Sequence, residues 1–93
     1  MFAGVQGHVV AKSQSGNEEV WAGPLANGDF AVILLNMGDQ PAVIEGSFKD
    51  IGIVSSKAAV YDIWQHKEIG SAEGNVTAKV ESHGVAFYRL TPQ

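Results

Sequence analysis

The sequence contains no cysteine, and that absence alone excludes several kinds of site. Disulfide frameworks, thiolate zinc sites and cysteine nucleophiles all require sulfur that this chain does not carry. The chain also has no run of about 18 apolar residues, so we expect no membrane-spanning segment. Only six side chains are basic, against ten acidic ones, and the basic residues are scattered. A face that neutralises a row of phosphates is therefore not expected, and nucleic acid is excluded as a partner.

The 93 residues predict a single domain that spans residues 1–93. A chain of this length buries only about 60–65% of the surface that its unfolded form exposes. Such a chain has room for one modest core. We therefore expect neither a second domain nor a deep catalytic cleft beside a complete core.

The composition and the residue pattern favour an all-β fold. Valine and isoleucine number 17 against 4 leucines, and β-branched side chains pack well on strands but lose rotamer freedom in helices. Val76, Ala78 and Val80 alternate with polar residues, which predicts a half-buried strand at residues 75–81. A weaker alternation predicts a strand at residues 42–48, where Gly46 indicates a bulge or a close backbone approach.

Turn signals separate further apolar segments. Asn27-Gly28 lies between apolar residues 20–25 and 30–35 and is typical of a type I′ hairpin turn. A turn at residues 37–41 leads into the next strand, with Pro41 as its first residue, so the strands are expected to run as a meander. Further strands are expected at residues 7–11, 58–64 and 85–90. About seven or eight short strands at this spacing indicate a sandwich or a barrel.

The segment at residues 30–35 is apolar on both faces, unlike residues 75–81. A strand of this kind is expected to be covered from both sides. One cover would be the domain's own second sheet. The other would be a loop or the surface of a partner, because a monomeric domain seldom leaves a broad apolar patch in water.

The histidines do not predict a complete metal site. Asp62, Trp64 and His66 would share one face if their strand continues that far, so a carboxylate and an imidazole could share a metal ion or a proton. Two ligands do not complete a metal site, and a structural role for His66 is favoured. His83 is expected in a turn and His8 in the first strand, neither with an evident partner. We predict no metal and no cofactor.

The sequence predicts no catalytic residue. Its ten carboxylates include no pair whose separation can be argued from sequence, as glycosidic acid/base chemistry requires. Serine catalysis is not indicated either, because no G-x-S-x-G elbow occurs. The glycine-containing turns match neither a phosphate loop nor a dinucleotide fingerprint.

Four aromatic side chains leave carbohydrate binding open as an alternative. Trp21, Trp64, Tyr61 and Tyr88 could offer flat faces to sugar rings, although rings in so small a domain are more often part of the core. Because side chains alternate along a strand, Tyr61 and Trp64 are expected to point to opposite faces, so at most one of them would join a single platform.

Asn75-Val76-Thr77 is an N-glycosylation sequon, with Asn75 on the predicted polar face of its strand. A glycan could be accommodated there. Short sequons also arise by chance, so the motif is compatible with a secretory parent protein without establishing one.

An ordered succession of blocks between residues 4 and 92 resembles one known segment. The blocks are Gly4-Val5-Gln6-Gly7, Glu19-Val20-Trp21-Ala22-Gly23-Pro24-Leu25, Ala31-Val32-Ile33-Leu34-Leu35-Asn36, Asp50-Ile51-Gly52, Asp62-Ile63-Trp64-Gln65-His66-Lys67, Ser82-His83-Gly84 and Leu90-Thr91-Pro92. Together they are similar to the C-terminal β-sandwich domain of family 27 glycoside hydrolases, the α-galactosidase or melibiase type. The order of the blocks is more specific than any one block.

The resemblance implies an antiparallel Greek-key β-sandwich that packs against an N-terminal (β/α)8 barrel. In that family the barrel carries two aspartates, a nucleophile and an acid/base, which release terminal α-linked galactose by a retaining mechanism. The barrel motifs have no counterpart in this sequence, so no catalytic residue is carried over and the chain is not expected to be an enzyme on its own. Residues 4–7 resemble the junction with the barrel, and the apolar strand at residues 30–35 would belong to the interdomain interface.

The function implied by the resemblance is that of a non-catalytic accessory domain that stabilises the barrel of an α-galactosidase. The expected partner is that barrel, and self-association through the exposed face is expected without it. The alternative is an independent module that binds galactosides through Trp64 or Trp21. The compartment of the chain is left open, with a secreted, vacuolar or lysosomal parent compatible with the family.

Overall fold

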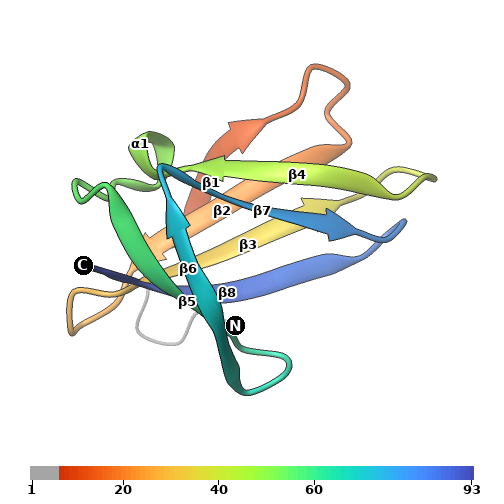
Figure 1. Cartoon of the computed structure of the whole chain (residues 1–93). Coiled ribbons are helices and arrows are strands. Elements are labelled where there is room, and N and C mark those ends of the chain that lie inside the picture. Colours follow the sequence, from red (N-terminus) through yellow and green to blue (C-terminus); the bar gives the residue numbers. More distant parts are fainter. Residues whose placement is uncertain (1–6) are drawn as a thin grey trace.

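The computed structural model describes residues 7–93, which form eight strands and one short helix in two antiparallel sheets (Figure 1). The strands are β1 (His8–Lys12), β2 (Glu18–Pro24), β3 (Phe30–Asn36), β4 (Ala42–Ser47), β5 (Lys57–Asp62), β6 (Lys67–Glu73), β7 (Asn75–Val80) and β8 (Val85–Pro92), with the helix α1 (Phe48–Ile51) after β4. The predicted all-β sandwich is confirmed. Gly4, Val5 and Gln6 of the expected junction lie outside the described residues. Within residues 7–93, no helix is long and apolar enough to cross a membrane.

The two sheets differ in size. The larger sheet has the order β1-β2-β3-β8-β5-β6, and the smaller one pairs β4 with β7. The chain crosses to the smaller sheet for β4, returns to the larger sheet for β5 and β6, and crosses again for β7. It returns a second time for β8, which lies between β3 and β5. A strand that returns past intervening strands to lie beside an earlier one is typical of a Greek key. The predicted meander therefore holds for β1 to β3 and is wrong for β4, which leaves the sheet.

The side chain of Asn36, only 1% exposed, fixes the crossover after β3. Its Nδ2 donates to the backbone oxygens of Gln40, at 2.8 Å, and of Val80, at 3.0 Å. Its Oδ1 accepts a hydrogen bond of 2.9 Å from the backbone N–H of Gly38. A buried amide without such partners would destabilise the fold. These bonds therefore hold the turn after β3 and join the end of β3 to the end of β7.

The core lies between the two sheets, and Gly46 of β4 faces it directly. A Cβ at this position would lie 3.4 Å from Cγ1 of Val20 and 3.5 Å from Cδ1 of Ile51 and Cδ2 of Leu34. These are ordinary van der Waals distances, so side chains of the close-packed core come up to the backbone at Gly46. Since β4 pairs with β7 in unbroken register, Gly46 marks a close backbone approach and not a bulge.

The strand predicted at residues 42–48 is too long. β4 ends at Ser47, whose Oγ accepts a hydrogen bond of 3.4 Å from the backbone N–H of Asp50 and caps α1. Gly52 follows the helix with a φ of 104°, a left-handed conformation that suits glycine. Phe48 therefore reaches the core from a helix and not from a strand.

The hairpin predicted between residues 20–25 and 30–35 is present, but its turn is not type I′. That type requires a positive φ at both Asn27 and Gly28, and only Gly28 has one, at 89°. The N–H of Gly28 donates to the carbonyl of Leu25 at 3.3 Å, and Oδ1 of Asn27 accepts from the N–H of Asp29 at 3.2 Å. The side chain of Asn27 thus stabilises a longer loop than the dipeptide predicts.

No pattern in the sequence predicts β6. Six of its seven residues are exposed, so neither face of the strand is regularly apolar. β6 is an edge strand that pairs only with β5, and it is held by backbone hydrogen bonds more than by burial.

We predict that Phe48→Ala lowers the free energy of unfolding by about 3–5 kcal/mol, because truncating a buried ring leaves a cavity. The residue is 3% exposed and belongs to the core cluster. Val80→Ala removes fewer buried atoms and should destabilise the fold less. Urea denaturation measures both. Val54→Ala, at a fully exposed site, is the control and should change stability by less than about 0.5 kcal/mol. A loss below about 1 kcal/mol for Phe48→Ala would contradict its place in a packed core.

Candidate functional site

The outer face of the larger sheet carries a row of apolar side chains. Residues directly opposite each other in antiparallel strands lie on the same face, and the register aligns Val9, Trp21, Ile33 and Phe87 across β1, β2, β3 and β8. In the described part of the chain, none of these four belongs to the core cluster between the sheets. All four are half-buried by their neighbours. We call them the apolar row.

More exposed hydrophobic side chains extend the apolar row. Trp64 is 61% exposed and meets Phe87 edge to face, with ring centroids 5.7 Å apart and planes at 70°. Leu35 and Val85 lie opposite each other on the same face, and Val85 is 40% exposed. The row is therefore the centre of a wider apolar surface.

Charged side chains beside the apolar row have partners there. The indole N–H of Trp21 donates to Oε1 of Glu19 at 2.9 Å. The guanidinium carbon of Arg89 lies 4.5 Å from the ring centroid of Tyr61, a cation–π contact, and its Nε is 3.6 Å from Oδ2 of Asp29. The charges therefore flank the row and do not interrupt it.

The structure brings Trp21 and Trp64 to the same side of the larger sheet. Tyr61 shares that side, whereas Tyr88 faces the core. The expectation that Tyr61 and Trp64 point to opposite faces is wrong, because β5 ends at Asp62 and Trp64 lies in the turn that follows. Strand alternation does not extend to a residue in a turn.

Asp62, Trp64 and His66 do not share a strand face. The carboxylate of Asp62 accepts hydrogen bonds from the backbone N–H of Gln65, at 3.2 Å, and from its side-chain Nε2, at 2.7 Å. His66 has a φ of 55° and is exposed in the same turn. Asp62 therefore stabilises the turn. Within residues 7–93, no three histidine or acidic side chains lie close enough together to hold a metal ion.

His83 lies in the expected turn, with a φ of 56°, but it has a partner that the sequence does not reveal. Its Nε2 is 3.2 Å from Oδ1 of Asp39. Next to it, the hydroxyl of Ser82 donates to the carbonyl of Gly38 at 2.9 Å. Both members of the histidine pair are exposed, so the pair contributes little to stability. His8 begins β1, as expected.

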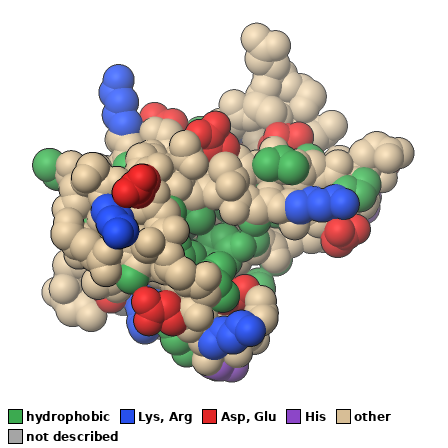
Figure 2. All heavy atoms as spheres, in the orientation of Figure 1, with side chains coloured by type: hydrophobic (Ala, Val, Ile, Leu, Met, Phe, Trp, Pro, Cys, Tyr) green, Lys and Arg blue, Asp and Glu red, His purple; other side chains and the backbone are tan. Residues whose placement is uncertain are grey.

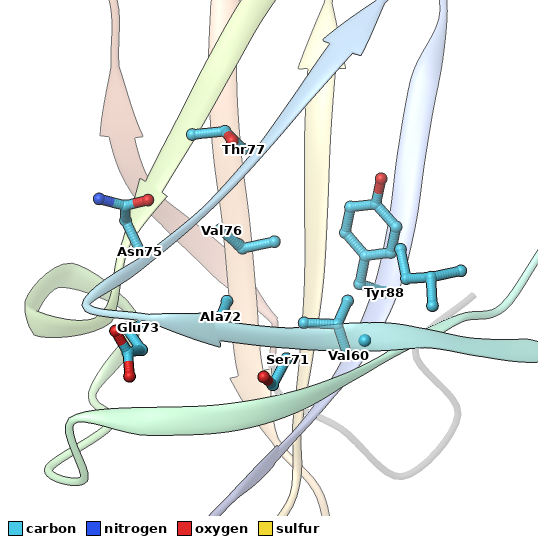
Figure 3. Close-up of a pocket in the computed structure, with 10 residues that line it drawn as sticks. Val60, Ser71, Ala72, Glu73, Asn75, Val76, Thr77 and Tyr88 are labelled. Carbon is cyan, nitrogen blue, oxygen red and sulfur yellow. The ribbon is translucent and has the colours of Figure 1, made fainter.

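A hollow of about 290 Å³ opens between β6 and β7, where the smaller sheet stops covering the larger one. Figure 2 shows hydrophobic side chains at its floor, near the centre of the view. Figure 3 shows Val60, Ala72, Val76 and Tyr88 around it, one each from β5, β6, β7 and β8. Glu73 is the only carboxylate among the residues that line the hollow. The hollow thus lacks the pair of carboxylates that glycoside hydrolysis requires.

Burial raises the pKa of the Tyr88 hydroxyl above its ordinary value of 10.0, and the negative charge of Asp62 raises it further. Both effects destabilise the negatively charged phenolate form of Tyr88. The folded state therefore holds the proton of Tyr88 more tightly than the unfolded chain does.

We predict a loss of stability at alkaline pH that depends on Tyr88. Because the folded pKa lies above the unfolded one, this contribution is fully present below pH 10.0 and is lost as the pH rises through the folded pKa. Urea denaturation of the protein and of Tyr88→Phe should give a stability difference that is constant near neutral pH and shifts in favour of the variant above pH 10. The same difference at every pH would contradict the raised pKa.

Sequence reasoning identified part of the outer face and missed part of it. Residues 30–35, Trp21 and Trp64 were singled out, but Phe87 and Arg89 were not. A signal for Phe87 is present, because residues 85–88 are apolar without interruption, the same two-sided pattern as in residues 30–35. No comparable signal exists for Arg89, whose contact with Tyr61 depends on the pairing of β5 with β8.

Comparison with known proteins finds a matching family model and several similar enzymes. Residues 15–90 match the family described as the alpha galactosidase C-terminal beta sandwich domain. The alpha-galactosidase of Coffea arabica is 40% identical over 91 residues, which cover 97% of this chain and 24% of that protein.

Solved structures agree with the sequence match. The crystal structure of alpha-galactosidase I from Mortierella vinacea superposes with a TM-score of 0.82 at 28% identity, covering 94% of this chain and 24% of that one. A family 27 β-L-arabinopyranosidase from Geobacillus stearothermophilus gives a TM-score of 0.86 at 20% identity, with 95% and 20% covered, a likeness of fold. The chain spans about a quarter of the length of the α-galactosidases that it matches.

Proposed function

The chain belongs to the α-galactosidase C-terminal β-sandwich family, and we propose that the outer face of its larger sheet packs against the catalytic (β/α)8 barrel of a parent α-galactosidase and stabilises it. The observation that carries the proposal is the apolar row, which lies outside the domain's own core. A monomeric domain seldom leaves such a surface in water. The matched enzymes are about four times longer than this chain, so they have room for the barrel that the resemblance implies.

The residues around the apolar row suit an interdomain interface. Aromatic side chains and arginine contribute most of the energy of protein interfaces, and Trp64, Tyr61 and Arg89 all lie on this face. The stacking of Arg89 on Tyr61 also holds its guanidinium in place before a partner arrives, which lowers the entropy lost on docking.

In this proposal, the barrel hydrolyses terminal α-galactosides with retention of the anomeric configuration, and this domain supplies no reacting group. The hollow beside β7 has a single lining carboxylate, and the outer face is mainly apolar. The pure chain should therefore release no chromophore from a chromogenic α-galactoside. Turnover by the pure chain would overturn this assignment.

We predict that substitutions in the outer face destabilise an assembled enzyme. The enzyme is a chimera in which this chain replaces the matched segment of the Coffea arabica α-galactosidase. Trp64→Ala should weaken docking by about 2 kcal/mol, because truncating a central interface tryptophan commonly costs this much, and Ile33→Asp should weaken it more. Thermal melting and residual α-galactosidase activity after heating measure the effect.

The matched control is Val43→Asp, at a site that is 69% exposed on the smaller sheet. Circular dichroism of the separate chains checks that each variant folds. In sedimentation, the unpaired wild-type chain should self-associate with rising concentration, and Trp64→Ala should reduce this association. If Trp64→Ala and Val43→Asp leave the chimera equally stable, the outer face is not the docking surface.

Independent galactoside binding is the alternative function, and the exposure of Trp64 is the observation that favours it. Trp21 is a poorer candidate, because its indole N–H is already bonded to Glu19. If the alternative holds, galactose or raffinose changes the tryptophan fluorescence of the chain at millimolar concentration, and Trp64→Phe abolishes the change. A flat titration would exclude the alternative.

A further inference from the structure

Each end of the apolar row carries an exposed cation next to a nearly buried carboxylate. At one end Lys12 lies opposite Glu19, with its Nζ 3.8 Å from Oε2. At the other end Nε of Arg89 is 3.6 Å from Oδ2 of Asp29. The side chains of Lys12 and Arg89 are 61% and 44% exposed, whereas those of Glu19 and Asp29 are 15% and 10% exposed. The ends of the row therefore present positive groups to a partner, and the matching negative groups are mostly out of its reach.

The guanidinium of Arg89 is held in place, but none of its hydrogen-bonding capacity is used within the domain. Its contacts with the ring of Tyr61 and with Asp29 fix its position. At 3.6 Å the ion pair is longer than a hydrogen bond. Within residues 7–93, no atom accepts a hydrogen bond from this side chain. The five N–H groups of the guanidinium are thus left to the solvent.

Docking on the outer face, as proposed above, would remove that solvent, and the present inference rests on that docking. Arg89 lies opposite Ala31 and Tyr61, and it is two residues from Phe87 of the apolar row. A partner that covers the row would therefore also cover Arg89. A guanidinium that loses its water without gaining acceptors would weaken the interface strongly.

A carboxylate is the group that best meets this need. Asp29 balances the charge of Arg89 but supplies it with no hydrogen bond. Because Nε faces Asp29, the two Nη groups are free to bind a partner, and their spacing matches the two oxygens of a carboxylate. The ammonium of Lys12 can bind a second carboxylate as a point charge.

The other charged strand residues of the outer face, within the part of the chain that the structure describes, lie on β5 and β6. Lys57 and Glu73 lie opposite each other, and Glu68 lies opposite Tyr61 on the side away from Arg89. None of the three lies between the apolar row and its two flanking cations.

We propose that the barrel surface that docks on the outer face carries a carboxylate opposite Arg89 and another opposite Lys12, with an apolar patch between them. The apolar patch supplies most of the binding energy, and the two carboxylates fix the orientation of the domain on the barrel. The pair at Arg89 is the stronger of the two, because it is bidentate and is buried beside Tyr61.

The test uses the chimera with the Coffea arabica enzyme described above. Arg89→Met and Lys12→Met remove the positive charges and keep the aliphatic stems. Both should lower the melting temperature of the chimera more than Lys79→Met does, and Arg89→Met by about 2–4 °C more. Lys79 is the matched control, since it is an exposed cation on the smaller sheet, opposite Val43. Arg89→Lys should fall between Arg89→Met and the wild type, because it keeps the charge but loses the paired N–H groups.

Arg89→Met also removes the ion pair with Asp29 inside the domain. Urea denaturation of the separate chains measures this internal part of each effect, so that it can be subtracted from the effect in the chimera. The remainder is the effect on docking.

The carboxylates of the barrel are then found by changing its exposed aspartates and glutamates to the amides, one at a time, with and without Arg89→Met. The carboxylate that binds Arg89 should lower the melting temperature when Arg89 is present and have a much smaller effect in Arg89→Met. If no carboxylate of the barrel depends on Arg89 in this way, the proposal is wrong.

Trp64→Ala separates this inference from the docking on which it rests. If Trp64→Ala destabilises the chimera but Arg89→Met and Lys12→Met behave like Lys79→Met, the outer face docks without these carboxylates and only the present inference fails. If Trp64→Ala is also without effect, the outer face is not the docking surface and both proposals fail.

Discussion

The hydrogen bonds of the Asn36 amide determine how the two sheets lie against each other. They hold the end of β3, the turn that leaves it and the end of β7 in one arrangement. Because the amide is buried, a placement of the smaller sheet that left it without these partners would be destabilised. β4 and β7 are thereby fixed over β2, β3 and part of β8, and they leave the inner side of β5 and β6 without a complete cover.

Because the two sheets are unequal in size, they leave two surfaces of different character. The outer surface is broad, follows the register of four strands, and has aromatic and arginine side chains at its margins. The inner one is a small hollow with a polar rim. A wide surface with few charges suits a protein neighbour.

The sequence predicts an element correctly where burial imposes a regular pattern of apolar residues. It does not predict the structure where hydrogen bonds, or pairing between distant segments, determine it. The alternation at residues 75–81 and the two-sided apolar pattern at residues 30–35 gave β7 and the position of β3, because each side chain there has a face to fill. β6 has no such pattern, since its residues are exposed. Phe48 was assigned to a strand because a buried aromatic residue suits either element, and only the cap at Ser47 ends β4 before it.

The candidate site, like the fold, could be predicted from the sequence only in part. Residues 30–35 indicated a surface that needs a cover, because their outer side chains are apolar in the sequence itself. The alignment of Ile33 with Phe87 could not be predicted, since it requires β8 to insert beside β3 although 48 residues (37–84) separate the two strands. The pairing of His83 with Asp39 was likewise hidden, because it joins two turns that are distant in the sequence.

The place of β8 at the centre of the larger sheet has a consequence for synthesis of the chain. β1, β2 and β3 can pair as they emerge from the ribosome, and so can β5 and β6, but these two groups share no hydrogen bonds with each other until β8 joins them. Among the strands of residues 7–93, the one translated last is thus the one that closes the sheet. Until it leaves the exit tunnel, the nascent chain exposes two unpaired strand edges, which makes this interval the one in which chaperone protection matters most.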